Sequence, residues 1–96
     1  MWILQTEGEE GNRMTFRVPD GAIKTVGRAT GAEFILDAAL VSRLHCRLTA
    51  TDSGLEVLDL DSTNGTFVNG KRVEKMLAQP GDQLKIGRVT LTVSRT

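Results

Sequence analysis

The stretch HCRLTA, residues 45–50, alternates between side chains suited to a protein core and side chains suited to solvent. Successive side chains of a β-strand point to opposite faces of its sheet. Cys46, Leu48 and Ala50 are therefore expected to face the core, while the residues between them face the other way. Residues 90–94, TLTVS, repeat the pattern. Two half-buried strands of this kind predict a sheet with one face packed against a core.

Outward from this strand, short apolar segments rich in β-branched residues are separated by Gly, Asn, Asp or Pro, which is typical of an all-β sandwich or barrel. Asn69-Gly70 predicts a tight hairpin, because both residues tolerate positive φ. Gly8 to Asn12 is expected to be a polar hairpin loop. Glu74 to Gln79 is expected to form one turn of helix at most, since Pro80 would end it. Ten strands are predicted, near residues 2–6, 14–18, 22–26, 33–35, 45–50, 55–60, 66–68, 71–73, 83–86 and 90–94.

Length and composition limit the function classes. Ninety-six residues with 40% apolar content can build one core, so we expect a single domain over residues 1–96. Twelve basic residues balance twelve acidic ones, whereas general nucleic-acid binders carry a basic excess. Cys46 is the only cysteine, which suits a reducing compartment. No apolar run is long enough to span a membrane, and acidic residues near the start argue against a signal peptide. A cytoplasmic domain with no membrane or nucleic-acid partner is expected.

Three polar clusters fall in the predicted turns or at strand edges, at residues 27–28, 42–45 and 62–65. Their side chains suit a phosphate. Arg28 and Arg43 would supply permanent charge in a fork geometry, Ser42 a hydroxyl and Asn64 an amide. A phosphorylated side chain carries about −1.5 to −2 charges at neutral pH, so two arginines would roughly neutralise it.

Together the clusters resemble a known family. Gly-Arg at 27–28, Ser-Arg-x-His at 42–45, and Ser-Thr-Asn-Gly-Thr at 62–66 followed by Val-Asn-Gly at 68–70 are similar to the motifs of the forkhead-associated (FHA) domain, in the usual order and spacing. The resemblance implies an FHA-like β-sandwich of about ten to eleven mostly antiparallel strands. It also implies a module that binds phosphothreonine in partner proteins, downstream of a serine/threonine kinase, with no cofactor.

The resemblance assigns roles to individual positions. Arg28 and Ser42 look like the phosphate ligands, and Arg43 like a contact to phosphate or peptide main chain. Thr63 and Asn64 resemble the pair that contacts the peptide backbone. Three further positions, Gly27, His45 and Gly65, resemble structural supports of the loops.

Selectivity is expected at the third residue after the phosphothreonine. In the family, the stretch before Ser-Arg-x-His contributes to this preference, and here it reads Asp37-Ala38-Ala39-Leu40-Val41. Leu40 is the candidate wall of a pocket for an apolar side chain, and Asp37 would repel an acidic one if it lies close. The alternative is that Leu40 and Val41 turn inward and plug the end of the core.

Four other functions are compatible with parts of the sequence. A Ser42–His45–Asp59 catalytic triad lacks any nucleophile elbow, so catalysis is not expected. A metal site at His45-Cys46 is disfavoured, because the neighbours should face opposite ways and no further ligand pair exists. A small single-stranded nucleic-acid barrel would need stacking aromatic residues on a basic face. A scaffold on the same fold that binds partners without phosphate stays open as the alternative to a phosphopeptide-binding module.

Overall fold

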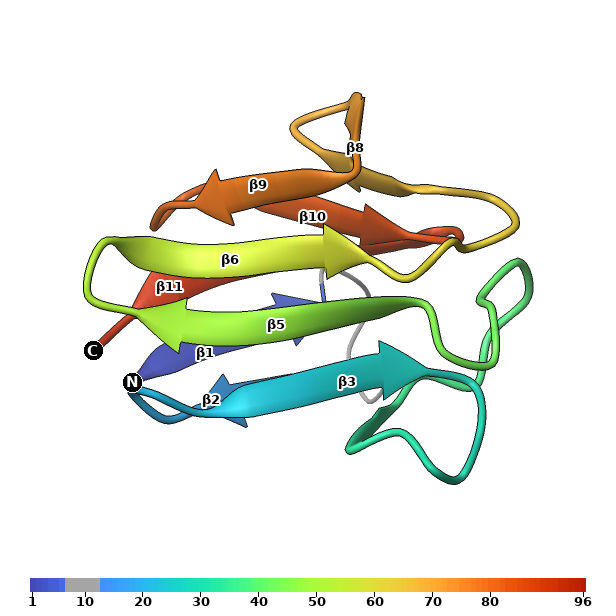
Figure 1. Cartoon of the computed structure of the whole chain (residues 1–96), viewed down its shortest axis with the longest axis horizontal. Coiled ribbons are helices and arrows are strands. Elements are labelled where there is room, and N and C mark those ends of the chain that lie inside the picture. Colours follow the sequence, from blue (N-terminus) through green and yellow to red (C-terminus); the bar gives the residue numbers. More distant parts are fainter. Residues whose placement is uncertain (7–12) are drawn as a thin grey trace.

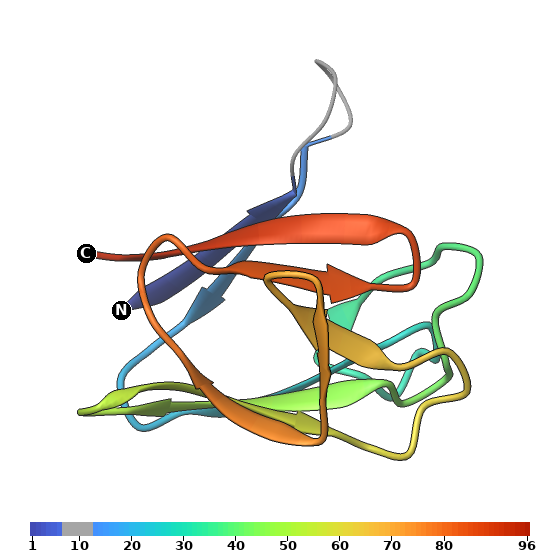
Figure 2. The same ribbon diagram turned by 90° about the horizontal axis from the view of Figure 1, so that it is seen from above.

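The computed structural model describes residues 1–6 and 13–96, which form a sandwich of two β-sheets (Figures 1 and 2). Eleven strands and no helix are found among these residues, so the predicted all-β sandwich is confirmed. The hairpin loop expected at Gly8 to Asn12 lies outside the described residues. No helix in the described ranges could span a lipid bilayer. The strands are β1 (Trp2–Thr6), β2 (Thr15–Val18), β3 (Ile23–Gly27), β4 (Phe34–Ile35), β5 (Cys46–Thr51), β6 (Gly54–Asp59), β7 (Thr66–Val68), β8 (Lys71–Val73), β9 (Lys75–Ala78), β10 (Gln83–Ile86) and β11 (Val89–Arg95).

One sheet has six strands in the order β2-β1-β11-β10-β7-β8, and the other has five in the order β4-β3-β5-β6-β9. All the pairings are antiparallel except that of β3 with β4, which is parallel. The first and last strands pair directly, with Leu4 opposite Val93. Both ends of the described chain therefore belong to the same sheet.

The core lies between the sheets and contains the alternate side chains that the sequence pattern indicates. On β5, Cys46 and Leu48 are fully buried and Ala50 nearly so, as predicted. At one open edge of the sandwich, Phe16 of β2 stacks on Phe34 of β4 with ring centroids 4.6 Å apart. The two rings pack between the edge strands of the two sheets. Aromatic side chains bury a large apolar area each, so this pair helps to join the sheets at that edge.

The segment Glu74 to Gln79 was predicted wrongly. It contains β9, which pairs with β6 so that Val57 lies opposite Met76. Lysine, methionine, leucine and alanine all favour helix locally, and two adjacent apolar residues hide the strand alternation. The edge of β6 offers a row of unpaired backbone groups to this segment, and pairing them outweighs the weak local preference.

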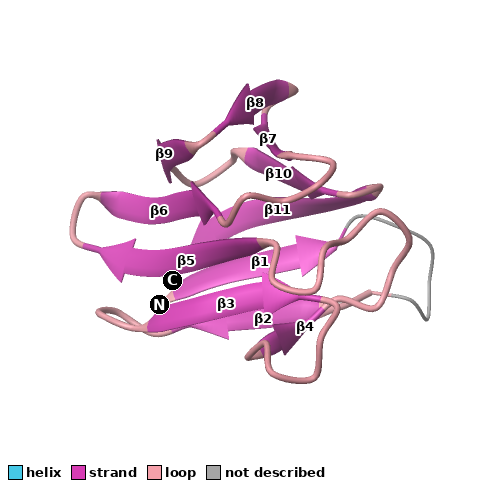
Figure 3. Ribbon diagram, turned by 45° about the vertical axis from the view of Figure 1, so that its right-hand side comes forward, coloured by secondary structure: helices cyan, strands magenta, loops and turns pink. Residues whose placement is uncertain are grey.

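The loops that carry the three polar clusters meet at one end of the sandwich (Figure 3). The turns after β3, before β5 and after β6 all lie there, while both termini lie at the opposite end (Figure 1). The fold thus gathers segments from residues 27, 42 and 63 that are far apart along the chain.

Candidate functional site

A groove of about 610 Å³ opens at this end of the sandwich. One side is the loop that runs from β4 to β5, and the other is the loop after β6. The lining residues are Arg28, Asp37, Ala38, Ala39, Leu40, Val41, Ser42, Arg43, Thr63 and Asn64. All five residues expected to bind phosphopeptide, and Leu40 besides, therefore border one groove.

Arg28 follows directly after β3, and two of its own hydrogen bonds and one of the next residue tie it to the opposing loop. Its backbone N–H donates to the Ser42 carbonyl at 3.0 Å, and its side-chain Nε donates to the Val41 carbonyl at 3.1 Å. The next residue repeats the pattern, with Ala29 N–H donating to the Arg43 carbonyl at 3.0 Å. The Nε contact orients the guanidinium and leaves its four terminal N–H groups available to an anion.

Gly27 is required by how closely these two segments approach. A Cβ atom on this residue would lie 2.0 Å from the Arg43 carbonyl oxygen and 2.8 Å from its carbonyl carbon. Both atoms belong to backbone, so no side-chain rotation could relieve the clash. Gly27 therefore allows the Arg28 and Arg43 segments to lie together.

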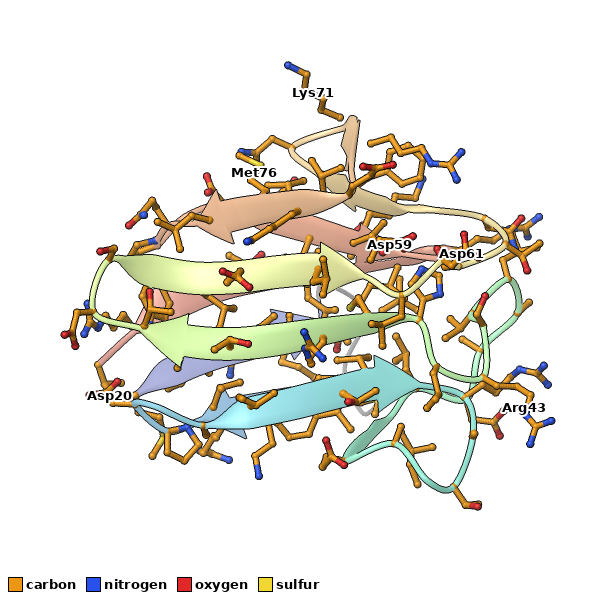
Figure 4. The ribbon with its side chains drawn as sticks, viewed as in Figure 1. Asp20, Arg43, Asp59, Asp61, Lys71 and Met76 are labelled. Atoms are coloured by element: carbon orange, nitrogen blue, oxygen red, sulfur yellow. The ribbon has the colours of Figure 1, made fainter. Side chains whose placement is uncertain are left out.

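Arg43 is exposed, and Figure 4 shows its side chain projecting away from the sandwich at the loop end. The described residues contain two ion pairs, Met1 with Asp20 and Lys75 with Glu56. Neither involves Arg28 or Arg43. Both guanidinium groups beside the groove are therefore without a carboxylate partner among the described residues.

His45 is fully buried beneath the two loops. Its Nδ1 accepts a hydrogen bond from the Ser42 backbone N–H at 3.0 Å, and its Nε2 lies 2.8 Å from the Gly65 carbonyl oxygen. A carbonyl can only accept, so Nε2 carries the proton and the ring is the neutral Nε2–H tautomer. The imidazole therefore joins the Ser42 loop to the Gly65 loop through their backbones.

Two further hydrogen bonds hold these loops together across the groove. The Ser42 hydroxyl oxygen accepts from the Thr63 N–H at 3.0 Å, and Asn64 Nδ2 donates to the Leu40 carbonyl at 3.2 Å. The Ser42 hydroxyl proton is not used in the contact with Thr63. It remains available to donate to a ligand.

Asp59, the last residue of β6, organises the turn that follows this strand (Figure 4). Its carboxylate accepts from the Ser62 hydroxyl at 2.5 Å, from the Ser62 N–H at 3.1 Å and from the Thr66 hydroxyl at 2.7 Å. Burial acts to raise the pKa of Asp59, but these hydrogen bonds stabilise the charged form and lower the pKa from its ordinary value. The Ser62 hydroxyl in turn accepts from the Gly65 N–H at 3.0 Å.

Leu40 and Val41 take opposite orientations. Val41 is buried in the core, whereas Leu40 is 45% exposed and lines the groove. A backbone φ of +69° at Leu40 separates the two directions. Only half of the inward-plug alternative is therefore correct. Asp37 also borders the groove.

The geometry does not form a Ser42–His45–Asp59 triad. Both His45 nitrogens contact backbone groups, the Ser42 hydroxyl contacts Thr63, and Asp59 contacts its own loop.

Among the described residues no group of three metal-ligating side chains is found. Burial, with a smaller contribution from Asp59, raises the pKa of Cys46 to about 12, so its thiol is protonated at neutral pH.

Sequence reasoning missed two neighbours of the groove. Gly87, in the turn between β10 and β11, has a φ of +61°, and a Cβ there would lie 2.9 Å from the Ala39 carbonyl oxygen. Arg72, on β8, lies across Gly65, where an added Cβ would be 2.8 Å from its Nε. Neither residue belongs to a polar cluster, and only the pairing of distant strands brings them to this end.

Comparison with known proteins agrees with this geometry. A family model described as "FHA domain" matches residues 24–87, two thirds of the chain. The ABC transporter ATP-binding/permease protein Rv1747 of Mycobacterium tuberculosis is 42% identical over 79 residues, which cover 82% of this chain. The glycogen accumulation regulator GarA of the same organism is 35% identical over 72 residues, covering 75% of this chain. The matched regions span 9% of the transporter and 44% of GarA.

A solved structure resembles the whole sandwich. It is described as "Structural and functional analysis of phosphothreonine-dependent FHA domain interactions", with a TM-score of 0.84 and 29% identity. The alignment covers 99% of this chain and 96% of that one. With the three motifs converging on one groove and the family model matching most of the sandwich, the chain belongs to the forkhead-associated (FHA) domain family.

Proposed function

We propose that this domain binds protein segments that carry phosphothreonine, in the groove between the two loops. The observation that carries the proposal is the convergence of Arg28, Ser42 and Arg43 on one groove with their donors free of carboxylate partners among the described residues. A phosphate needs several donors at once, and charge-assisted hydrogen bonds are the strong ones. The phosphothreonine-dependent interactions described for a structurally similar FHA domain support the same activity.

Each groove residue has a part in this proposal. The Arg28 guanidinium, oriented by its contact with the Val41 carbonyl, and the Ser42 hydroxyl proton bind the phosphate. Arg43 adds a second charge from the exposed side. Thr63 and Asn64 contact the main chain of the bound segment. Gly27, His45 and Gly65 hold the loops in register and do not touch the ligand.

Selectivity beyond the phosphate follows from the loop before Ser42. Leu40 offers an exposed apolar surface in the groove, and Asp37 borders the same groove. An apolar side chain at the third position after the phosphothreonine gains contact with Leu40, while an acidic one is repelled by Asp37. One buried aliphatic side chain is worth about 1.5–3 kcal/mol at most, so this discrimination is modest.

In this proposal the domain is an adaptor that recruits a partner once a serine/threonine kinase has modified it. It binds and does not catalyse, and it acts inside the cell, where such kinases and their substrates meet. Residues 1–96 form one FHA domain, which the direct pairing of β1 with β11 supports.

Arg28→Ala tests the assignment of the phosphate site. Removing one partner of a charge-assisted pair costs about 2–5 kcal/mol, which would shift a micromolar Kd towards millimolar. Isothermal titration with a phosphothreonine peptide measures the loss. Arg47→Ala is the matched control, because Arg47 is an exposed arginine on β5 away from the groove.

Three results are distinguishable. Loss of binding in the Arg28 variant alone supports the phosphate site. Equal affinity of Arg28→Ala and the unchanged protein contradicts it. Equal binding of the unphosphorylated peptide would favour the alternative, a scaffold that recognises partners without phosphate.

A further inference from the structure

A cationic side chain lies beside the groove without belonging to any of its motifs. Arg72 projects from β8 across Gly65, and an added Cβ on Gly65 would lie 2.8 Å from its Nε and 3.1 Å from its Cζ. Gly65 directly follows Asn64, which lines the groove. The Arg72 guanidinium therefore stands next to the wall of the phosphopeptide groove.

Strand pairing places a second cationic residue on the same outer face of the six-stranded sheet as Arg72. Phe67 pairs with Arg72 on one side and with Lys85 on the other. Arg72 and Lys85 are exposed and Phe67 is half-buried. Neighbouring strands are about 4.8 Å apart, so the backbone positions of Arg72 and Lys85 lie roughly 10 Å apart, with Phe67 on the strand between them. We call these three residues the basic ridge.

The strands of the sheet that carries the basic ridge contain no counter-charge for its cations. The six strands of this sheet contain five Lys or Arg residues and no Asp or Glu. Among the described residues, no ion pair involves Arg72 or Lys85. The five-stranded sheet differs, because there Lys75 pairs with Glu56 at 3.9 Å.

We propose that the basic ridge is a second binding subsite, which takes an acidic stretch of the same partner segment whose phosphothreonine occupies the groove. This inference rests on the proposed function. Charge complementarity selects the occupant, since Arg72 and Lys85 form no ion pair among the described residues and a positive patch is complementary to a negative one across an interface. Phe67 adds apolar contact for the stems of the acidic side chains. In an extended chain, acidic residues two or three positions apart are about 7–10 Å apart, which is comparable to the spacing of the strand positions that carry the two cations.

The test uses three phosphothreonine peptides that bind the intact domain in a fluorescence-anisotropy titration. One has neutral flanks, and the others carry a six-residue flank rich in Glu either before or after the phosphothreonine. Six extended residues reach about 20 Å, which is enough to pass from the groove onto the sheet of a molecule with a longest extent of 32 Å.

One of the acidic flanks should tighten binding about two- to fivefold for each ion pair formed. The Arg72→Gln/Lys85→Gln double variant should lose that gain while binding the neutral-flank peptide unchanged. Arg17→Gln is the matched control, because Arg17 is an exposed cation on β2, at the other edge of the same sheet. It should keep the gain.

The remaining outcomes each overturn a specific idea. If the neutral-flank peptide binds but neither acidic flank improves affinity, or if Arg17→Gln removes the gain equally, the basic ridge is not a subsite. If a single-stranded DNA oligonucleotide binds the ridge as tightly as the acidic peptide, the surface belongs to nucleic acid and the proposal is wrong. If no phosphothreonine peptide binds the intact domain, the proposed function itself fails, and the ridge proposal fails with it.

Discussion

His45→Ala should destabilise the domain strongly, because this imidazole is fully buried and joins two loops. Truncation leaves the buried Gly65 carbonyl without its donor, at a cost of about 1–3 kcal/mol. The space vacated by the ring adds a cavity penalty of about 1–2 kcal/mol. The sum, roughly 2–5 kcal/mol, is a large share of the about 5–14 kcal/mol expected for 96 residues.

Thermal unfolding followed by circular dichroism measures this loss. At about 4–8 °C per kcal/mol for a domain of this size, Tm should fall by at least about 8 °C. Peptide binding by the variant at low temperature should persist, since the imidazole does not line the groove. His45→Gln is the graded control, because its amide can still donate to the Gly65 carbonyl, and its Tm should lie between the other two. An unchanged Tm for His45→Ala would refute the bridging role.

Four further predictions follow from named contacts. A phosphothreonine peptide should bind more tightly than its phosphoserine counterpart by about 0.8 kcal/mol, the worth of one buried methyl group; equal affinities in calorimetry would argue against an apolar niche. In a peptide-library screen, Leu40→Lys should change the preferred residue at the third position after the phosphothreonine from apolar to acidic. An unchanged preference would show that Leu40 does not contact that residue. Cys46, with its pKa raised to about 12 by burial, should resist Ellman's reagent at pH 8 until the protein unfolds, so fast labelling of folded protein would contradict the structure. Because the pKa of Asp59 is lowered in the folded state, the stabilisation that its carboxylate provides is present above about pH 4 and is lost as the pH falls through the folded pKa. The difference in unfolding free energy between wild type and Asp59→Asn should therefore shrink over that pH range. A difference that stays constant would contradict the assignment.

The local pattern of apolar and turn-forming residues was enough to predict most of the strands. The ten predicted strands are present, with ends within one residue of the prediction, because each has an apolar face and turn residues beside it. The Asn69-Gly70 turn adopts the positive φ values, +51° and +82°, that its composition indicates. The exception is β9, whose residues Lys75–Ala78 have no alternation of their own and become a strand only by pairing with β6.

For the candidate site, the identity of the residues could be predicted from the sequence, but their arrangement in space could not. Short motifs of ordered spacing were enough to single out Arg28, Ser42, Arg43, Thr63 and Asn64 as candidate site residues. Their convergence on one groove depended on strands that pair across the whole chain.

Which side chains point into the groove, and which lie just outside it, depends on the packing of separate segments. Leu40 is exposed beside the groove while Val41 is buried in the core, because a φ of +69° at Leu40 turns the backbone between them. Arg72 reaches Gly65 because β8 pairs with β7. Nothing in the order of residues signals either contact, since each depends on where a separate segment of chain packs.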